Sequence, residues 1–210
     1  MARTGYEVGK RVCDVVVAGV GVVLLSPVLT TIAVVVGLDS PGPVLYKGRR
    51  TGMHGVPFNI LKFRTMGVDA ERSGTTTARN DPRITRVGRF LRRWKLDELP
   101  QLFNVLRGDM SLVGPRPEVE EHTSVYDDQE LEILTVRPGI TDYSSVHFID
   151  LAGALGDENP HEVFVTRVRA QKNALRLEYV RKRSFTEDLR IIGLTAAALL
   201  KTMTSRKPKD

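Results

Sequence analysis

The feature that most limits how this chain can fold is an uncharged apolar run near its beginning. Val15 to Leu38 are 24 consecutive residues without a charged side chain. As a helix this run would be about 36 Å long, enough to cross a hydrocarbon core of about 30 Å. A removable signal peptide is a poor interpretation, because the run is too long and lacks a cleavage site with small residues. The sequence therefore predicts a retained segment that enters lipid.

A Ser-Pro pair lies near the middle of this run. Pro27 has no amide hydrogen, so the carbonyl of Val23 loses its helical partner and the helix kinks. The hydroxyl of Ser26 can bond to the freed backbone, which makes such a break tolerable in lipid. Two shapes remain open, a kinked helix that spans the membrane and a re-entrant hairpin that returns to the same face. Positive charges flank the run on both sides, and this symmetry favours the hairpin.

Composition narrows the class of protein further. The formal charge is +6 and the pI is about 9.6, which suits nucleic acid, an anionic lipid surface or a phosphorylated substrate. A nucleic-acid partner would explain the charge but would not explain the uncharged run. The single cysteine, Cys13, excludes a disulfide framework and a zinc site built from cysteines.

The segment after the run predicts a small sheet and a polar loop. Residues 44–46 and 57–63 are expected to be short strands, with Gly48 to Gly55 as the turn between them. Residues 67–82 are polar and contain the turn-forming runs Ser73–Thr77 and Asn80–Pro82. We expect this stretch to form a loop near the active site.

Residues 83–95 carry six basic side chains and no acidic one. As a helix, this segment would place Arg83, Arg86 and Arg89 on one face. The apolar counter-face would consist of Val87, Phe90, Leu91 and Trp94. A basic amphipathic helix with a tryptophan is typical of the membrane interface, where phosphate headgroups meet acyl chains.

The next segment contains the pair most suited to chemistry, Asp97 and Glu98. Apolar residues recur at helical spacing from Leu96 to Leu106, and Pro100 fits only a first turn. Asp97 is therefore expected to be the N-cap and Glu98 the first helical residue. Adjacent carboxylates repel each other unless a cation relieves them. Mg²⁺ would do so and would screen a diphosphate from an anionic nucleophile. The plainer alternative is a helix cap with an exposed neighbour.

Two rigid turns follow, and each carries an arginine. Gly108 to Pro117 includes Arg116 between two prolines, so its guanidinium is preorganised for a phosphate or a planar base. Val136 to Thr141 is a second turn, with Arg137. Together the two turns are expected to form walls of an anion-binding site.

Five segments resemble the motifs of a known family. They are Lys62–Met66, Asn80–Thr85, Leu96–Leu102, Gly108–Pro117 and Arg137–Thr141. These long, ordered motifs are similar to those of the bacterial sugar transferase family, the monotopic polyprenyl-phosphate phosphoglycosyltransferases. The resemblance extends from about Gly9 to Thr141 and resumes weakly from Tyr179 to Ile192.

The resemblance implies a reaction in two displacements. Asp97 matches the family's nucleophile, which attacks the β-phosphate of a UDP-sugar, releases UMP and holds a phosphosugar. Undecaprenyl (polyprenyl) phosphate then attacks this intermediate, as the first membrane step of surface glycan synthesis. Glu98 matches the partner acid, assigned either to Mg²⁺ or to orienting the diphosphate. Substrate-binding roles fall on basic residues at matching positions, namely Lys62, Arg64, Arg92, Arg116 and Arg137.

The resemblance also implies an arrangement at the membrane. Ser26 and Pro27 match the helix break of a re-entrant hairpin, which would comprise residues 1–39. Residues 40–204 would form a small mixed α+β catalytic domain with interfacial amphipathic helices, and residues 205–210 a disordered tail. The expected location is the cytoplasmic face of the bacterial inner membrane, with membrane lipids as partners. The oligomeric state, a homodimer included, stays open.

One region departs from the family pattern. Asp142 stands where many members have glycine, and an arginine of a later turn is missing from residues 142–150. Because this region is expected to contact the sugar, the identity of the donor does not transfer. His147 is interpreted as a packed or surface histidine rather than a sugar ligand.

Two other functions compete with a transferase. A non-catalytic membrane-anchored scaffold would explain the apolar run, but it leaves the Asp97–Glu98 pair without a role. A hydrolase of the aspartyl-phosphate type shares the covalent chemistry and needs no lipid acceptor.

Overall fold

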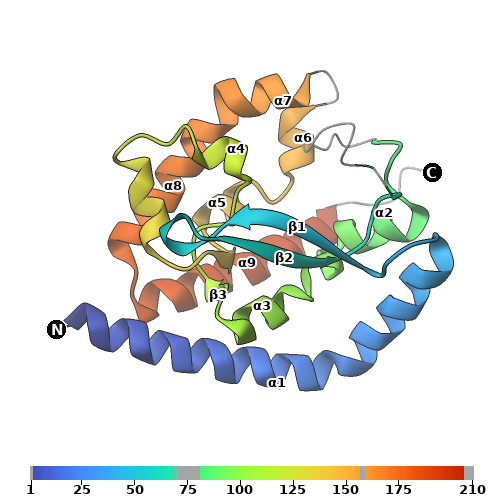
Figure 1. Cartoon of the computed structure of the whole chain (residues 1–210), viewed down its shortest axis with the longest axis horizontal. Helices are drawn as coiled ribbons and strands as arrows, with labels where there is room; N and C mark the ends of the chain where they lie inside the picture. Colours follow the sequence, from blue (N-terminus) through green and yellow to red (C-terminus); the bar gives the residue numbers. More distant parts are fainter. Residues whose placement is uncertain (1, 69, 71–80, 157–158, 206–210) are drawn as a thin grey trace.

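The structure, a computed structural model, contains helices arranged around two small sheets, which confirms the mixed α+β class (Figure 1). The described residues are 2–68, 70, 81–156 and 159–205. Most of the predicted loop 67–82 and most of the predicted tail 205–210 lie outside them.

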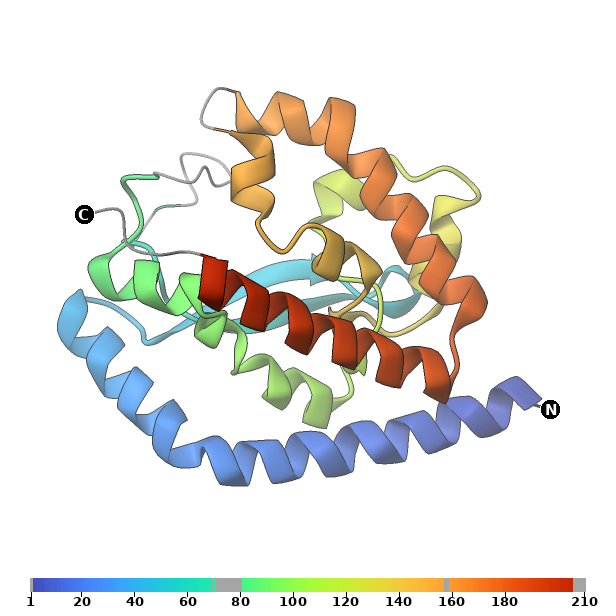
Figure 2. The ribbon, with the colours of Figure 1, turned by 180° about the vertical axis from the view of Figure 1, so that it is seen from behind.

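The apolar run lies inside one continuous helix, α1, which extends from Ala2 to Asp39. Pro27 lies within this helix, and the Ser26 hydroxyl donates to the Val23 carbonyl at 2.8 Å. This bond confirms the predicted compensation for the missing amide. Figure 2 shows that α1 bends around the body of the molecule and is not broken into two antiparallel halves.

One face of α1 packs on the domain, and the other exposes aliphatic side chains. Ala18 is fully buried, and Gly19 and Gly21 lie against leucines of helix α3 (Gln101–Arg107). The opposite face exposes Val8, Val12, Val16, Val20, Val23, Leu24, Val34 and Leu38. The helix is long and apolar enough to cross a membrane, and 11% of its most apolar stretch is buried. That fraction is unlike the core helix of a soluble protein.

Strands β1 (Leu45–Thr51) and β2 (Pro57–Phe63) form an antiparallel hairpin, in which Tyr46 pairs with Lys62. The second strand has its predicted bounds. The prediction of a turn from Gly48 to Gly55 was wrong, because β1 continues to Thr51 and the reversal is confined to the residues between the strands. In that reversal, Gly55 has a φ of 77°, which glycine adopts without a steric penalty.

The basic segment forms a shorter helix than predicted, α2 (Arg86–Arg93). Thr85 is its N-cap and accepts a hydrogen bond from the Gly88 amide at 2.9 Å. Arg83 therefore precedes the helix, where it forms an ion pair with Asp81. The predicted apolar face is divided, since Leu91 is buried and Phe90 is 56% exposed.

The prediction that Asp97 caps a helix was also wrong. Leu96–Glu98 is a 3₁₀ turn, Pro100 is the N-cap residue of α3, and no side chain caps this helix. Pro100 has helical angles that suit a first turn, but Leu96–Glu98 form a separate element, and Leu99 lies between it and Pro100. The carboxylate of Asp97 is consequently not used on the backbone of α3.

A second sheet was missed in the sequence, where both of its strands were interpreted as turns. Strands β3 (Ser111–Val113) and β4 (Gly139–Thr141) pair in parallel. Gly114, directly after β3, and Gly139, the first residue of β4, approach each other closely. A Cβ on Gly139 would lie 2.1 Å from the backbone nitrogen of Gly114. This approach brings the Arg116 loop beside the chain that follows β4.

We expect Gly139→Ala to lower the free energy of unfolding by about 2 kcal/mol or more, because backbone must move to accommodate the methyl group. Gly193→Ala is a matched control, since its added Cβ would meet nothing within 4 Å. In a helix that change is neutral or stabilising. Thermal unfolding in detergent would compare the two variants. A Gly139→Ala protein that unfolds at the wild-type temperature would contradict this packing.

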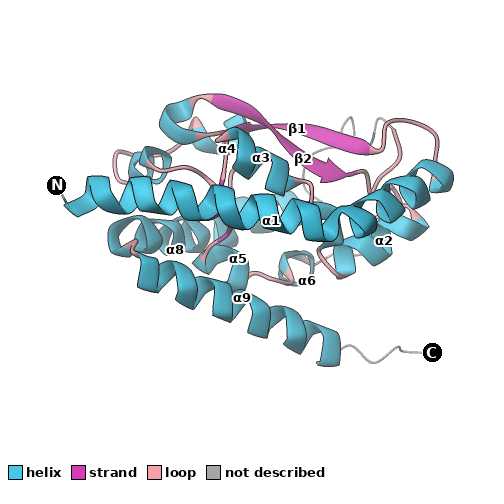
Figure 3. Ribbon diagram, turned by 90° about the horizontal axis from the view of Figure 1, so that it is seen from below, coloured by secondary structure: helices cyan, strands magenta, loops and turns pink. Residues whose placement is uncertain are grey.

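Shorter helices and two long ones complete the fold. They are α4 (Glu120–Thr123), a 3₁₀ segment (Glu130–Thr135), α5 (Tyr143–His147), α6 (Leu151–Leu155), α7 (Pro160–Val163), a π-helical segment (Phe164–Val168), α8 (Arg169–Lys182) and α9 (Phe185–Ser205). Figure 3 shows the β1–β2 hairpin and α9 on opposite sides of α1. The core between α1, β2 and α3 contains Ala18, Ile60, Val105 and Met110.

Candidate active site

The turn between α2 and α3 delivers Asp97 and Glu98. Lys95 has a φ of 55°, in the left-handed region that a residue with a Cβ adopts at a cost. This conformation ends α2 and starts the 3₁₀ turn. Asp97 is 7% exposed as a result, so its carboxylate faces the interior.

Glu98 is held by two cations from distant parts of the chain. Lys62 Nζ, from β2, lies 3.1 Å from Glu98 Oε1. Arg116, from the loop after β3, donates through Nη1 to Oε2 at 3.0 Å and through Nη2 to Oε1. This two-pronged contact fixes the guanidinium plane. The side chains of Lys62 and Arg116 remain 22% and 24% exposed. The structure thus brings together four of the residues singled out in the sequence.

The pKa values of the two adjacent carboxyl groups are shifted in opposite directions. Burial raises the pKa of Asp97 above its ordinary value, and the charge of Glu98 raises it further. Burial alone would also raise the pKa of Glu98, but Arg116 and Lys62 hold it well below its ordinary range. When two carboxyl groups are in contact and only one of them is paired with cations, their pKa values usually move apart in this way. Glu98 is therefore the fixed anion, and Asp97 is the carboxyl group whose charge is least compensated.

Asp97 and Gln101 contain buried polar atoms without partners among the described residues. Asp97 Oδ1 has none, and neither does the oxygen or the nitrogen of the Gln101 carboxamide. Gln101 is fully buried and follows Asp97 by about one helical turn. Buried polar atoms are nearly always satisfied, so this cluster suits a ligand with both acceptors and positive charge. Gln101 was missed in the sequence, where only its helical spacing from Asp97 could have indicated it.

Arg92 lies at the end of α2 and is half-buried. Its charge is close enough to lower the pKa of Asp97, after the larger effects of burial, Glu98, Lys62 and Lys95. Its guanidinium has no hydrogen-bond partner in the part of the chain that the structure describes. Its predicted position near the phosphates stays a prediction.

Two other predicted substrate residues are engaged elsewhere. Arg64 is 7% exposed and donates to the carbonyls of Val36, Ser40 and Pro43, where it closes the end of α1. Arg137 Nε donates to the carbonyl of Gly108 at 3.1 Å, just after α3. These contacts support structural roles, so the predicted substrate roles of both arginines have no support from their geometry.

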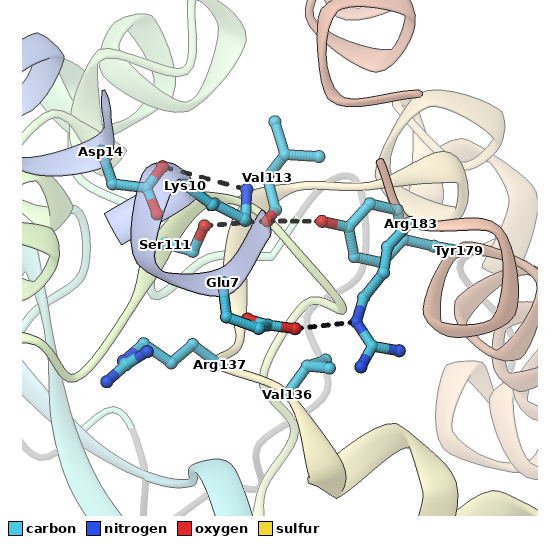
Figure 4. Close-up of a pocket in the computed structure, with 9 residues that line it drawn as sticks. All are labelled: Glu7, Lys10, Asp14, Ser111, Val113, Val136, Arg137, Tyr179 and Arg183. Atoms are coloured by element: carbon cyan, nitrogen blue, oxygen red, sulfur yellow. Dashed lines mark hydrogen bonds and ion pairs between the residues drawn. The ribbon is translucent and has the colours of Figure 1, made fainter. Parts of the chain in front are cut away.

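Arg137 also lines a small cavity between α1, β3 and α8 (Figure 4). Across this cavity, Glu7 pairs with Arg183 at 3.0 Å. Nearby, Lys10 contacts Asp188 at 2.8 Å. The first half of α1 is thereby tied to the C-terminal helices.

The donor set fits a magnesium ion only in combination with a substrate. Among the described residues, no group of three or more histidine, cysteine, aspartate or glutamate side chains could hold a metal. Mg²⁺ commonly binds through one or two carboxylates together with substrate phosphates. Both oxygens of Glu98 already contact Arg116, whereas Asp97 Oδ1 is unpartnered. Asp97 is therefore better placed than the predicted ligand Glu98 to contact such an ion.

A second buried charge cluster lies behind Arg116 and was not recognised in the sequence. Glu118, 15% exposed, accepts hydrogen bonds from Lys172 at 3.1 Å and from Arg176, which is 1% exposed. Arg176 also donates to Asn173 at 2.8 Å. In the sequence these residues resemble the solvated side of a charged helix, because nothing local indicates what α8 packs against.

The sequence matches the bacterial sugar transferase family over residues 5–202. A UDP-glucose:undecaprenyl-phosphate glucose-1-phosphate transferase of Caulobacter vibrioides is 40% identical over 206 residues, which cover 96% of this chain and 73% of that protein. A protein of the same name from Escherichia coli is 42% identical over 191 residues, or 89% of this chain and 39% of that protein.

A UDP-N-acetylgalactosamine-undecaprenyl-phosphate N-acetylgalactosaminephosphotransferase of Aeromonas hydrophila is 42% identical over 146 residues, or 67% of this chain and 34% of that protein. This chain thus spans most of the first relative and well under half of the other two. The names of the relatives differ in the sugar, so they do not select a donor. The family match extends over nearly the whole chain and includes the Asp97–Glu98 pair with its two cations. The chain belongs to the bacterial sugar transferase family, a family of phosphoglycosyltransferases.

Proposed function

We propose that this protein transfers a sugar 1-phosphate from a UDP-sugar to undecaprenyl phosphate and releases UMP. The observation that carries the proposal is the state of Asp97, a buried carboxyl group with an unpartnered oxygen beside a fully paired Glu98. A carboxylate with only a structural task would be paired as Glu98 is. The names of the relatives support the same classes of donor and acceptor.

The reaction proceeds in two displacements at one phosphorus atom. In the first, an Asp97 oxygen bonds to the β-phosphorus, and the bond to the oxygen that bridges to the α-phosphorus breaks. UMP leaves with that oxygen and its electron pair. In the second, a phosphate oxygen of undecaprenyl phosphate bonds to the same phosphorus, and the bond to Asp97 breaks. The carboxylate is thereby restored, so the enzyme turns over.

The surrounding residues supply positive charge that needs no rearrangement. Lys62 and Arg116 are held in place by Glu98 and present their exposed parts to the donor phosphates. Arg92 adds a cation on the side of α2. The unpaired carboxamide of Gln101 can donate to a phosphoryl oxygen. Mg²⁺, held by Asp97 or Glu98 together with the diphosphate, would neutralise charge on the donor when bound.

Contacts at both ends of α1 favour a re-entrant arrangement over a spanning one. Near its start, Lys10 and Glu7 bind Asp188 and Arg183 of the C-terminal segment. At its end, Arg64 binds the carbonyl of Ser40. A helix whose two ends contact one folded domain has both ends on the same side of a bilayer. The exposed aliphatic face between them would then enter lipid.

Two further helices are suited to the lipid interface. Helix α2 exposes Phe90 beside its arginines, and α9 exposes Phe185, Leu189, Ile192 and Leu200. Aromatic and aliphatic side chains beside basic residues suit the boundary between headgroups and acyl chains. The site would therefore lie at headgroup depth on the cytoplasmic face of the inner membrane, where the phosphate of a polyprenyl lipid is accessible.

The proposal is tested by exchange between labelled UMP and a panel of UDP-sugars, in nanodiscs with Mg²⁺ and without undecaprenyl phosphate. A covalent intermediate predicts that label enters the UDP-sugar of one or two donors in the absence of the acceptor. UMP release that requires the acceptor, without exchange, would refute the covalent route. Accumulation of free sugar phosphate without acceptor would favour a hydrolase of the aspartyl-phosphate type. The absence of any reaction under all of these conditions would favour a non-catalytic scaffold.

A further inference from the structure

Asp142 occupies a fully buried position at the junction of the second sheet and α5. Its Oδ1 accepts hydrogen bonds from the amide and the hydroxyl of Ser145, both at 2.7 Å. The hydroxyl of Ser144 lies 2.9 Å from both carboxylate oxygens. Asp142 Oδ2 also accepts from the backbone amide of Arg116 at 3.3 Å. One buried carboxylate thus joins the start of α5 to the loop that carries Arg116.

The same loop is held from its other side by α8. Glu118, two residues after Arg116, binds Lys172 and Arg176 of that helix. Arg116 Nη1 also donates to the carbonyl of Ile140 at 3.2 Å. The Arg116 loop is therefore fixed by β4, by Asp142 and by α8, while its guanidinium reaches forward to Glu98. Within the described residues Asp142 forms no hydrogen bond or ion pair with Asp97 or Glu98, so any effect on them passes through Arg116.

The charge of Asp142 has no cation of its own in this arrangement. Within the described residues, all of its hydrogen-bond donors are neutral groups. Its negative charge acts on two arginines, since it adds to the effect of Glu98 on the pKa of Arg116 and to that of Glu118 on Arg176. A helix of five residues does not require a buried carboxylate as its cap, because serine or asparagine serves equally. The carboxylate at this position calls for another explanation.

We propose that Asp142 is a positioning residue that holds Arg116 in its donor-binding orientation. The inference rests on the proposed function, in which Arg116 binds the UDP-sugar. Asp142 anchors the backbone of Arg116 from behind, and Glu98 anchors the guanidinium from the front. The helices after residue 142 therefore influence how tightly the donor binds, although they lie behind the reacting groups. Asp142, which stands where many family members have glycine, is thus a determinant of donor affinity.

The test compares four proteins, wild type, Asp142→Asn, Arg116→Lys and the double variant, by steady-state kinetics with the donor identified in the exchange assay. Asn keeps the shape of the side chain and removes its charge. We expect Asp142→Asn to raise the donor KM about tenfold with little change in kcat, as for a lost ground-state binding contact. Because Asp142 acts through Arg116, the double variant is expected to have nearly the KM of Arg116→Lys.

The outcomes separate this inference from the proposed function. An unchanged KM in Arg116→Lys would refute the role of Arg116 in donor binding, whatever Asp142 does. A raised KM in Arg116→Lys with an unchanged KM in Asp142→Asn would overturn the present inference alone. Equal effects of Asp142→Asn in the two backgrounds would overturn it as well, because the residue would then act independently of Arg116.

Two further variants separate an effect on donor binding from a loss of folding. Asp128→Asn makes the same chemical change at an exposed position and is expected to leave KM and the unfolding temperature unchanged. If Asp142→Asn unfolds, Ser145→Ala takes its place, because it removes only one hydroxyl that donates to Asp142. A two- to threefold rise in donor KM, again absent in the Arg116→Lys background, is expected from that milder change. A Ser145→Ala protein that unfolds at a lower temperature without a rise in KM would indicate a purely structural role.

Discussion

Asp97→Asn is expected to lower the rate of UMP release by at least about a thousandfold, because the substitution removes the proposed nucleophile. Asn has nearly the shape of Asp but cannot form the acyl phosphate. The loss should appear in the exchange reaction without acceptor as well as in full turnover, since both require the same first displacement.

The same substitution is expected to leave stability unchanged or slightly increased. The pKa of Asp97 is raised in the folded protein, chiefly by burial. A carboxyl group whose pKa is raised on folding opposes folding when it is ionised, and this cost is present at pH values above the raised pKa. Asn removes the charge and with it the cost. An inactive variant with an undiminished unfolding temperature would exclude loss of structure as the cause.

Measurement requires purified protein in nanodiscs, UMP release over time, and thermal unfolding of the same preparations. Asp128→Asn provides the control for the chemical change at an exposed site. UMP release by Asp97→Asn at the wild-type rate would remove Asp97 from the mechanism. Loss of both activity and folding would show instead that the carboxyl group stabilises the fold.

Glu98→Gln is expected to cost activity and stability together. The change leaves Lys62 and Arg116 close to each other without their shared anion. Removing one member of a buried ion cluster commonly costs about 3 kcal/mol, reduced here because both cations remain partly exposed. We expect a drop in kcat/KM of about ten- to a hundredfold, since the two cations that face the donor lose their fixed geometry.

Glu98→Gln is also expected to change how activity depends on pH, and the direction of this change can be stated. In the proposed mechanism the ionised form of Asp97 attacks, so the rate is expected to rise with pH through the raised pKa of that group. Glu98 is a cause of that raised pKa, second only to burial. Glu98→Gln is therefore expected to move the acidic limb of the kcat/KM profile to lower pH, even as the maximal rate falls. An acidic limb that stays in place or moves to higher pH would contradict the assignment.

Stability follows a different pH window, because the pKa of Glu98 is lowered in the folded protein. A carboxyl group of this kind stabilises the fold above its ordinary pKa, and the contribution is lost as pH falls towards the folded value. The difference in unfolding temperature between wild type and Glu98→Gln should thus be largest near neutral pH and shrink on acidification. Thermal unfolding at a series of pH values measures it directly.

Local sequence was sufficient to predict the parts of this protein that depend on neighbouring residues. An uncharged run predicts a lipid-directed helix wherever it packs, and the Ser26 hydroxyl bonds to Val23 as its position suggests. Strand β2 has the predicted bounds.

Tertiary structure decided which charged residues face the site and which support it. Arg64 and Arg137 lie in motifs as characteristic as that of Arg116, yet they bind backbone carbonyls at helix ends. The parallel pairing of β3 with β4 joins segments far apart in the chain, so no local pattern reveals it. Burial of Arg176 depends on what α8 packs against.

The sequence by itself determined the long apolar helix, the family and the identity of the Asp97–Glu98 pair, because these depend on residue type and short spacing. Only the tertiary structure decided that Asp97 is the unpaired carboxyl group and that Glu98 is the paired one. The physical reason is that an ionisation state depends on burial and on the distances to charges from other segments. Those distances exist only once the chain has folded.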